Sequence, residues 1–205
     1  MMFEPHRTSD KKARPLSGLL QPIRCEWQEQ FDSITQAEVL RLMNHVLERE
    51  DTIGFPGPVA WDEGMRLMES TAQAVAAGEK HVLLFRTDDQ AIVGHVLLSR
   101  RTLPNCRHIG EIARTFVHPD YRGLSVVRSG LRAVLDRAEA IGIDVLQLDV
   151  RAGTRIARLW EALGFRVIGE MEDYARVIGQ RFAGYFMYQH VAVLRARLDG
   201  PRIGA

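Results

Sequence analysis

Cysteine is scarce in this chain of 205 residues, which contains only Cys25 and Cys106. The two lie far apart in the sequence, and neither belongs to a C-x-x-C pair or to a Cys/His cluster with metal-ligand spacing. We therefore expect no disulfide framework and no metal site, and a reducing cytoplasm is the compartment that fits such a chain best. The two thiols are then expected to be small hydrophobic side chains without a chemical role.

Long apolar runs are also missing. No stretch of roughly 18 apolar residues occurs, and no charged and then apolar leader opens the chain, so we expect neither a membrane span nor a secretory signal. Residues 1–20 have no apolar period and hold basic residues among proline and serine, which predicts a flexible basic arm. The remaining 46%-hydrophobic chain can bury one good core, so we predict a single domain over 21–195 and a short tail over 196–205.

Lysine is nearly absent, with 3 lysines against 24 arginines, and the net charge is only +1. This total conceals an uneven distribution. Residues 26–89 contain 13 acidic and 5 basic residues, whereas residues 100–158 contain 11 arginines and 6 acidic residues. Such asymmetry favours an anionic ligand on one side and a cationic one on the other, although solvated helix faces produce it equally well. Nothing in this balance predicts DNA binding.

Apolar periodicity divides the chain into elements. Spacings of three and four residues predict helices over 33–51 and 62–77 after a first strand over 22–27. From His81 the period changes to two or to continuous apolar runs. Strands are then expected over 81–86, 92–98 and 108–117, a helix ending at Gly142, a strand over 145–150, a helix over 154–163 and a hairpin over 167–174 and 182–191. The fold class is therefore α/β: about four helices and a mixed sheet of about seven strands, mostly antiparallel with one parallel pair.

The stretch from Phe116 to Gly142 organises the rest. A strand ends at Val117, the next residues form a turn through Pro119, and an amphipathic helix begins after Arg122 and Gly123. Unpaired N–H groups in the first turn of that helix, its positive dipole end and an adjacent arginine together favour binding of a phosphate.

This stretch resembles the acetyl-CoA site of the Gcn5-related N-acetyltransferase (GNAT) superfamily, which reads V-x-P-x-[YF]-[RQ]-G-x-G-x-[GA]. Val117 to Gly123 match its first half, whereas Ser125 and Val127 stand where the family has Gly and Gly or Ala. The family glycines let backbone N–H groups approach the pyrophosphate of CoA closely. The resemblance implies a donor site formed by Phe116, Val117, Arg122, Gly123, Leu124, Ser125, Val126, Val127 and Trp160.

The resemblance resumes at Leu159 to Phe165, which follow the family pattern L-Y-x-x-L-G-F with Trp160 in the tyrosine position. In the family that tyrosine often protonates the leaving thiolate, and an asparagine seven residues earlier contacts the cofactor; here Gly153 takes the asparagine position. An indole N–H donates a hydrogen bond but is no general acid near neutral pH. The C-terminal part is similar to tabtoxin-resistance-like small-molecule acetyltransferases, and the whole resemblance covers about 22–192.

Acyl transfer to an amine needs a base, and the resemblance points to Glu111, six residues before Val117. Tyr174 and Tyr188 are candidate acids, since phenols can return a proton, or walls of the acceptor pocket. Phe55, in a loop of alternating glycine and proline, His95 beside Gly94, and Arg114 are expected to border the acceptor. Simple alternation places Ile109, Glu111, Ala113, Thr115 and Val117 on one face of their strand, and Gly110, Ile112, Arg114 and Phe116 on the other.

The function predicted from these features is transfer of an acyl group, most simply acetyl, from acyl-CoA to the amine of a small molecule by a monomer or homodimer. Two alternatives stay open because the donor motif departs from the family. One is a transferase of this fold that takes its acyl group from aminoacyl-tRNA, whose phosphates need a broad basic surface. The other is a catalytically inactive domain that only binds.

Overall fold

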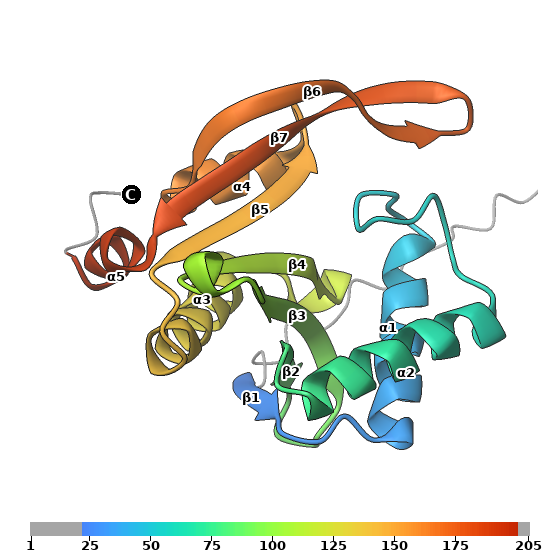
Figure 1. The fold of residues 1–205 in the computed structure, drawn as a ribbon. Helices are drawn as coiled ribbons and strands as arrows, with labels where there is room; N and C mark the ends of the chain where they lie inside the picture. The colour runs from blue at the N-terminus through green and yellow to red at the C-terminus, as the bar shows by residue number, and fades with distance from the viewer. Residues whose placement is uncertain (1–21, 201–205) are drawn as a thin grey trace, which may run out of the picture.

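The computed structural model describes residues 22–200 and shows a single mixed sheet flanked by helices (Figure 1). Its seven strands have the order β1-β2-β3-β4-β5-β7-β6, and each neighbouring pair is antiparallel except β4 and β5. The strands are β1 (Arg24–Gln28), β2 (Lys80–Arg86), β3 (Ile92–Arg100), β4 (Ile109–Val117), β5 (Val145–Arg151), β6 (Arg166–Val177) and β7 (Gln180–His190). The helices are α1 (Ser33–Leu47), α2 (Trp61–Ala76), α3 (Leu124–Ala140), α4 (Arg155–Leu163) and α5 (Val191–Asp199). The mixed sheet and its single parallel pair confirm the predicted fold class.

Two hydrophobic clusters lie on opposite faces of the sheet. On one face α1 and α2 pack their apolar stripes, including Val39, Met43 and Met68, against β2, β3 and β4. On the other face α3, α4 and α5 cover strands β2 to β5 and β7, with Leu131, Leu135, Trp160 and Leu194 in a second cluster. The stripes predicted for α1, α2 and α3 are the faces that point into these clusters, because residues three and four apart share one side of a helix.

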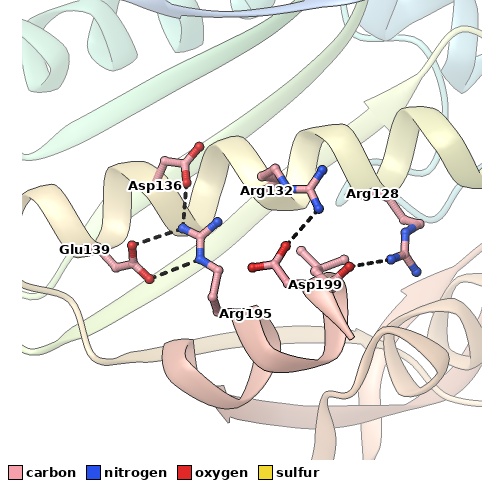
Figure 2. A network of polar contacts seen from close by, with 7 residues as sticks. Arg128, Arg132, Asp136, Glu139, Arg195 and Asp199 are labelled. Carbon is pink, nitrogen blue, oxygen red and sulfur yellow. Dashed lines mark hydrogen bonds and ion pairs between the residues drawn. The ribbon is translucent and has the colours of Figure 1, made fainter. Parts of the chain in front are cut away.

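Helix α5 was not expected from the sequence, where residues up to 191 were assigned to a strand and the tail to 196–205. Val191, Leu194 and Leu198 are buried and lie at helical spacing, so this short stretch becomes helical by covering α3. Its polar side is tied to α3 through Arg195, which contacts Asp136 at 2.6 Å and Glu139 at 3.0 Å (Figure 2). The predicted basic arm and residues 201–205 of the tail lie outside the described residues.

The face alternation predicted for β4 is wrong beyond Ala113. The ladder with β3 pairs Leu97 with Ala113 but His95 with Phe116, so β4 carries one extra residue there. Arg114 takes the extra place with a φ of +45°. This β-bulge reverses the alternation, and Ile112 and Val117 therefore lie on the same face, in the cluster with α3.

Phe85 of β2 fills a space left by two glycines. A Cβ at Gly94 of β3 would lie 2.2 Å from its ring, and a Cβ at Gly130 of α3 would lie 2.4 Å from it. The ring is 2% exposed. The close packing of α3 on the sheet therefore depends on the absence of a side chain at both glycines.

Within residues 22–200 no helix is both long and apolar enough to cross a membrane, and no group of three or more His, Cys, Asp or Glu side chains is arranged to hold a metal ion. Cys25 and Cys106 are free, and burial raises the pKa of the Cys25 thiol to about 11.

Candidate active site

The site is organised by the divergence of β4 and β5. These parallel strands pair over only three positions, from Ile109 with Val145 to Glu111 with Gln147, and then separate. The part of β4 from the bulge to Val117 therefore has β3 on one side and no strand partner on the side of β5. Backbone amides on an unpaired strand edge are free to bind an extended ligand.

The N-terminus of α3 stands at the end of β4. After Val117 a 3₁₀ turn at Pro119–Tyr121 leads to Gly123, the N-cap, which provides no side-chain cap for the first N–H groups of the helix. A Cβ at Gly123 would meet no atom within 4 Å, so the approach to these donors is open. Arg122 donates from Nε to the Val117 carbonyl at 3.0 Å and from Nη1 to Glu50, which fixes its guanidinium beside the helix end. An open helix N-terminus beside an arginine is an arrangement able to hold an anion, and we call this group the anion site.

Histidines lie next to this anion site. His118 stacks on His45 of α1 with ring centroids 4.8 Å apart. Burial, and then repulsion from His45, holds the pKa of His118 below its usual range, although the nearby Asp120 carboxylate opposes this. Protonation of His118 is therefore disfavoured unless an anion binds beside it.

A small cavity of about 30 Å³ lies between α3, α4 and the sheet. Its lining includes Thr115, Val117, Val127, Gly130 and Trp160. The Thr115 hydroxyl is buried there without a hydrogen-bond partner. Val127 packs its side chain against the core, away from the helix end, so it narrows the cavity instead of covering the N–H groups of the anion site.

Trp160 is 9% exposed and packs edge-to-face on Phe165. Of the predicted donor residues, those from Val117 to Val127 gather around the end of β4 and the start of α3. Phe116 lies on the opposite face of the sheet, where its ring stacks on His95 at 5.0 Å.

The predicted catalytic residues meet on the face of the sheet that α1 and α2 cover. Glu111 pairs with Gln147 of β5, and Gln147 in turn pairs with Tyr188 of β7. Paired residues on neighbouring strands share a face, so Glu111 and Tyr188 flank Gln147 with about 10 Å between their Cα atoms. A base and a phenol are thus close enough to act on one small acceptor.

Tyr174 lies farther along the same face. Its ring covers Gly184 of β7, and its hydroxyl donates to Asp149 of β5. Burial, and then this hydrogen bond to a carboxylate, raises the pKa of Tyr174 well above its usual range. Tyr174 therefore keeps its proton and serves better as a hydrogen-bond donor than as an acid.

Arg151 is the last residue of β5 and lies beyond Asp149 on the same face of the sheet. Its guanidinium contacts the Asp51 carboxylate at 3.0 Å and the Asp51 carbonyl at 2.9 Å, and stacks over Phe182 of β7 at 4.1 Å. The loop after α1 is thereby attached to β5 and β7, which brings Phe55 in that loop to the same side of the sheet. Sequence reasoning missed Glu50, Asp51, Asp149 and Arg151, because their contacts join residues as much as 100 positions apart.

His95 and Arg114 meet at the bulge. His95 is 2% exposed, and its Nδ1 donates to the Arg114 carbonyl at 2.8 Å. Burial lowers the pKa of His95 to about 4, so it is a neutral histidine of the core that holds the backbone of the bulge. Arg114 points its side chain towards α2, where Nη1 donates to the Thr71 hydroxyl at 3.2 Å.

Residues 41–165 match the sequence model of the acetyltransferase (GNAT) family. The chain belongs to this family. The match contains the diverging strands, the anion site at α3 and Trp160, so GNAT membership and the geometry described above concern the same residues. No curated protein matches the chain at a significant level.

Solved GNAT structures share the fold at low sequence identity. The GNAT acetyltransferase from Streptococcus pneumoniae is 20% identical, with a TM-score of 0.66, and the match covers 82% of this chain and 99% of that one. YncA from Salmonella typhimurium, solved with its cofactor acetyl-CoA, is 20% identical over 82% and 94% of the two chains, with a TM-score of 0.65. Spermidine N-acetyltransferase from Vibrio cholerae, solved with CoA and spermine, is 14% identical over 84% and 98%, with a TM-score of 0.65.

The basic stretch at 100–158 is partly neutralised in the described part of this GNAT fold. Four of its arginines pair with carboxylates: Arg122 with Glu50, Arg132 with Asp199, Arg137 with Glu29 and Arg151 with Asp51. Arg128 donates to the Leu198 carbonyl of α5 (Figure 2). Three of these four acids come from the acidic first half, so the charge asymmetry along the sequence is cancelled in part across the folded protein.

Proposed function

We propose that this protein is an N-acetyltransferase that moves the acetyl group of acetyl-CoA to the amine of a small molecule. The observation that carries the proposal is the uncapped N-terminus of α3, placed beside the unpaired edge of β4 where β5 diverges. Phosphates of the donor would bind the N–H groups of the first turn of α3 beside Arg122. The pantetheine arm, which carries two amides, would extend along the free edge of β4 towards the bulge.

The reaction requires a general base, stabilisation of the developing oxyanion and a hydrogen bond to the leaving thiolate. Glu111 would accept a proton from the acceptor ammonium, directly or through water, so that a free amine attacks the thioester carbonyl. Backbone N–H groups of β4 near Val117 would stabilise the oxygen on which negative charge develops. The departing thiolate needs little assistance because a thiol pKa is near 8.5, so the indole N–H of Trp160 is an adequate hydrogen-bond donor in place of an acid.

Aminoacyl-tRNA as donor is a weaker proposal for this geometry. A tRNA would need a continuous basic surface, whereas four arginines of the basic stretch are already paired with carboxylates. Only a measurement of acyl transfer distinguishes the catalytically inactive domain from these two transferases.

The test compares binding of acetyl-CoA and of bulk tRNA across a salt series, using Arg122→Ala and, as matched control, Arg132→Ala. Arg132 lies on the same helix but pairs with Asp199 of α5, away from the helix end. We expect acetyl-CoA binding that falls about 10-fold or more in Arg122→Ala and is unchanged in Arg132→Ala. Undetectable acetyl-CoA binding together with salt-sensitive tRNA binding would favour aminoacyl-tRNA over acetyl-CoA as the donor.

Turnover is tested with Glu111→Gln. Loss of the base should lower kcat/KM by on the order of 10²-fold and remove the acidic limb of the pH profile. An unchanged profile would exclude Glu111 as the base, and acetyl-CoA binding without transfer to any amine would favour the inactive domain.

A further inference from the structure

Arg114 is held in a backbone conformation that arginine rarely adopts. Its φ of +45° lies in the left-handed region, at the bulge where β4 gains a residue against β3. Its carbonyl is fixed by Nδ1 of the buried His95 at 2.8 Å. Backbone strain of this kind persists where surrounding structure enforces it, and such residues concentrate at functional sites.

The side chain of Arg114 is partly buried and has no acidic partner. Nη1 donates to the Thr71 hydroxyl, and no carboxylate within residues 22–200 forms an ion pair with the guanidinium. Burial accordingly lowers the pKa of Arg114. The other two guanidinium nitrogens of Arg114 form no hydrogen bond within residues 22–200 and are not fully buried, so a ligand can reach them.

Every other half-buried arginine within residues 22–200 donates to a carboxylate or to a backbone carbonyl. Four of them have side chains that are 11–23% exposed and contact a carboxylate: Arg86 with Glu26, Arg137 with Glu29, Arg151 with Asp51 and Arg195 with Asp136. Arg100 and Arg128 donate instead to the carbonyls of Arg107 and Leu198, whereas Arg114 reaches only a hydroxyl. Removing a cation from water is unfavourable unless an anion or a set of hydrogen bonds compensates. The contrast indicates that an anion outside the chain completes the environment of Arg114.

We propose that Arg114 binds a carboxylate of the acceptor, so that the acceptor is an amine that also carries a carboxylate, as an amino acid does. This inference rests on the proposed function. The contact with Thr71 of α2 places the side chain of Arg114 on the face that α1 and α2 cover. Glu111 lies on the same face, since its neighbour Ile112 points into the cluster on the other one.

The two charged side chains suit one zwitterion. Glu111 and Arg114 are three residues apart on β4, about 10 Å along the strand, and carry opposite charges. An acceptor ammonium would turn to Glu111 and its carboxylate to Arg114, whose planar guanidinium matches a carboxylate with two parallel hydrogen bonds. The bulge is what makes this pairing possible, because it moves Arg114 onto the same face as the proposed base.

The experiment compares acceptors that differ only in the carboxylate: lysine with cadaverine, arginine with agmatine, tyrosine with tyramine and histidine with histamine. Acetyl transfer and, separately, binding of each compound without donor are measured for the wild type, Arg114→Gln and Arg114→Asn. The Asn variant is included because asparagine tolerates a positive φ and should fold even if the Gln variant does not. Arg24→Gln is the control, since Arg24 is exposed on the outermost strand β1.

In the wild type and the control we expect one amino acid or more to exceed its decarboxylated partner in kcat/KM by about 10- to 100-fold. Both Arg114 variants should reduce this ratio to near one. Three results would overturn the inference. The wild type could prefer the decarboxylated amines, both Arg114 variants could keep the wild-type preference for the amino acid, or no amino acid could be bound or acetylated. If amino acids bind in an Arg114-dependent manner but no transfer occurs, the proposed function fails while the carboxylate site stands.

Discussion

His95 should make the stability of this protein depend on pH between about 6.5 and 4. The pKa of this buried imidazole is lowered to about 4 in the fold, chiefly by burial, from 6.5. The unfolded chain therefore binds a proton at a higher pH than the folded one. The stabilising preference for the neutral ring is fully present above pH 6.5 and is lost as the pH falls towards 4.

The size of the effect follows from these two pKa values. Between pH 7.5 and pH 5 the free energy of unfolding should fall by about 2 kcal/mol through His95 alone, since one pKa unit corresponds to about 1.4 kcal/mol. Urea unfolding at several pH values measures it in the wild type and in His95→Asn. The asparagine amide can still donate to the Arg114 carbonyl but does not titrate in this range.

The difference between the two curves isolates His95 from the carboxylates and from other histidines, whose titration is common to both proteins. We expect the fall between pH 7.5 and pH 5 to be smaller in His95→Asn by about 2 kcal/mol. Equal falls in the two proteins would show that His95 is not the buried neutral group described above, and would remove the support that it gives to the bulge.

Three further changes test the site and its supports. Glu50→Gln frees Arg122 from a competing carboxylate, so acetyl-CoA affinity measured by calorimetry should rise about two- to fivefold at low salt; a fall would mean that Glu50 orients the arginine. Gly130→Ala forces a methyl group onto the Phe85 ring and should lower the free energy of unfolding by about 1–3 kcal/mol despite the higher helix propensity of alanine, and an increase would refute the packing argument. Arg195→Met keeps the aliphatic stem but removes the contacts to α3, so hydrogen exchange of α5 amides should accelerate while global stability changes by about 1 kcal/mol or less, and unaltered exchange would contradict the attachment.

The fold could be predicted from the sequence because its elements are marked locally. Apolar residues at spacings of three and four define the buried faces of α1, α2 and α3, and the change to a period of two at β2 marks the start of a continuous series of strands. The strand, turn and helix around Pro119 and Gly123 predict an anion site for the same reason, since an uncapped helix N-terminus is a local property. The structure confirms the seven-strand sheet and its one parallel pair, and it shows the open end of α3 on which the predicted anion site depends.

The candidate acceptor face depends on contacts that no local pattern carries. A β-bulge is a mismatch between two strands, so the sequence of β4 alone predicted simple alternation and assigned Arg114 and Glu111 to opposite faces. The partners of Arg122 and Arg151 lie 72 and 100 residues away, so the sequence does not show that part of its charge asymmetry is cancelled in the folded protein. Helix α5 has only a short apolar repeat, and it is helical because α3 offers a surface to cover. Periodicity determines which residues are buried, but only the packing of distant segments decides which polar side chains meet, because electrostatic and hydrogen-bonding contacts act over a few ångströms in space.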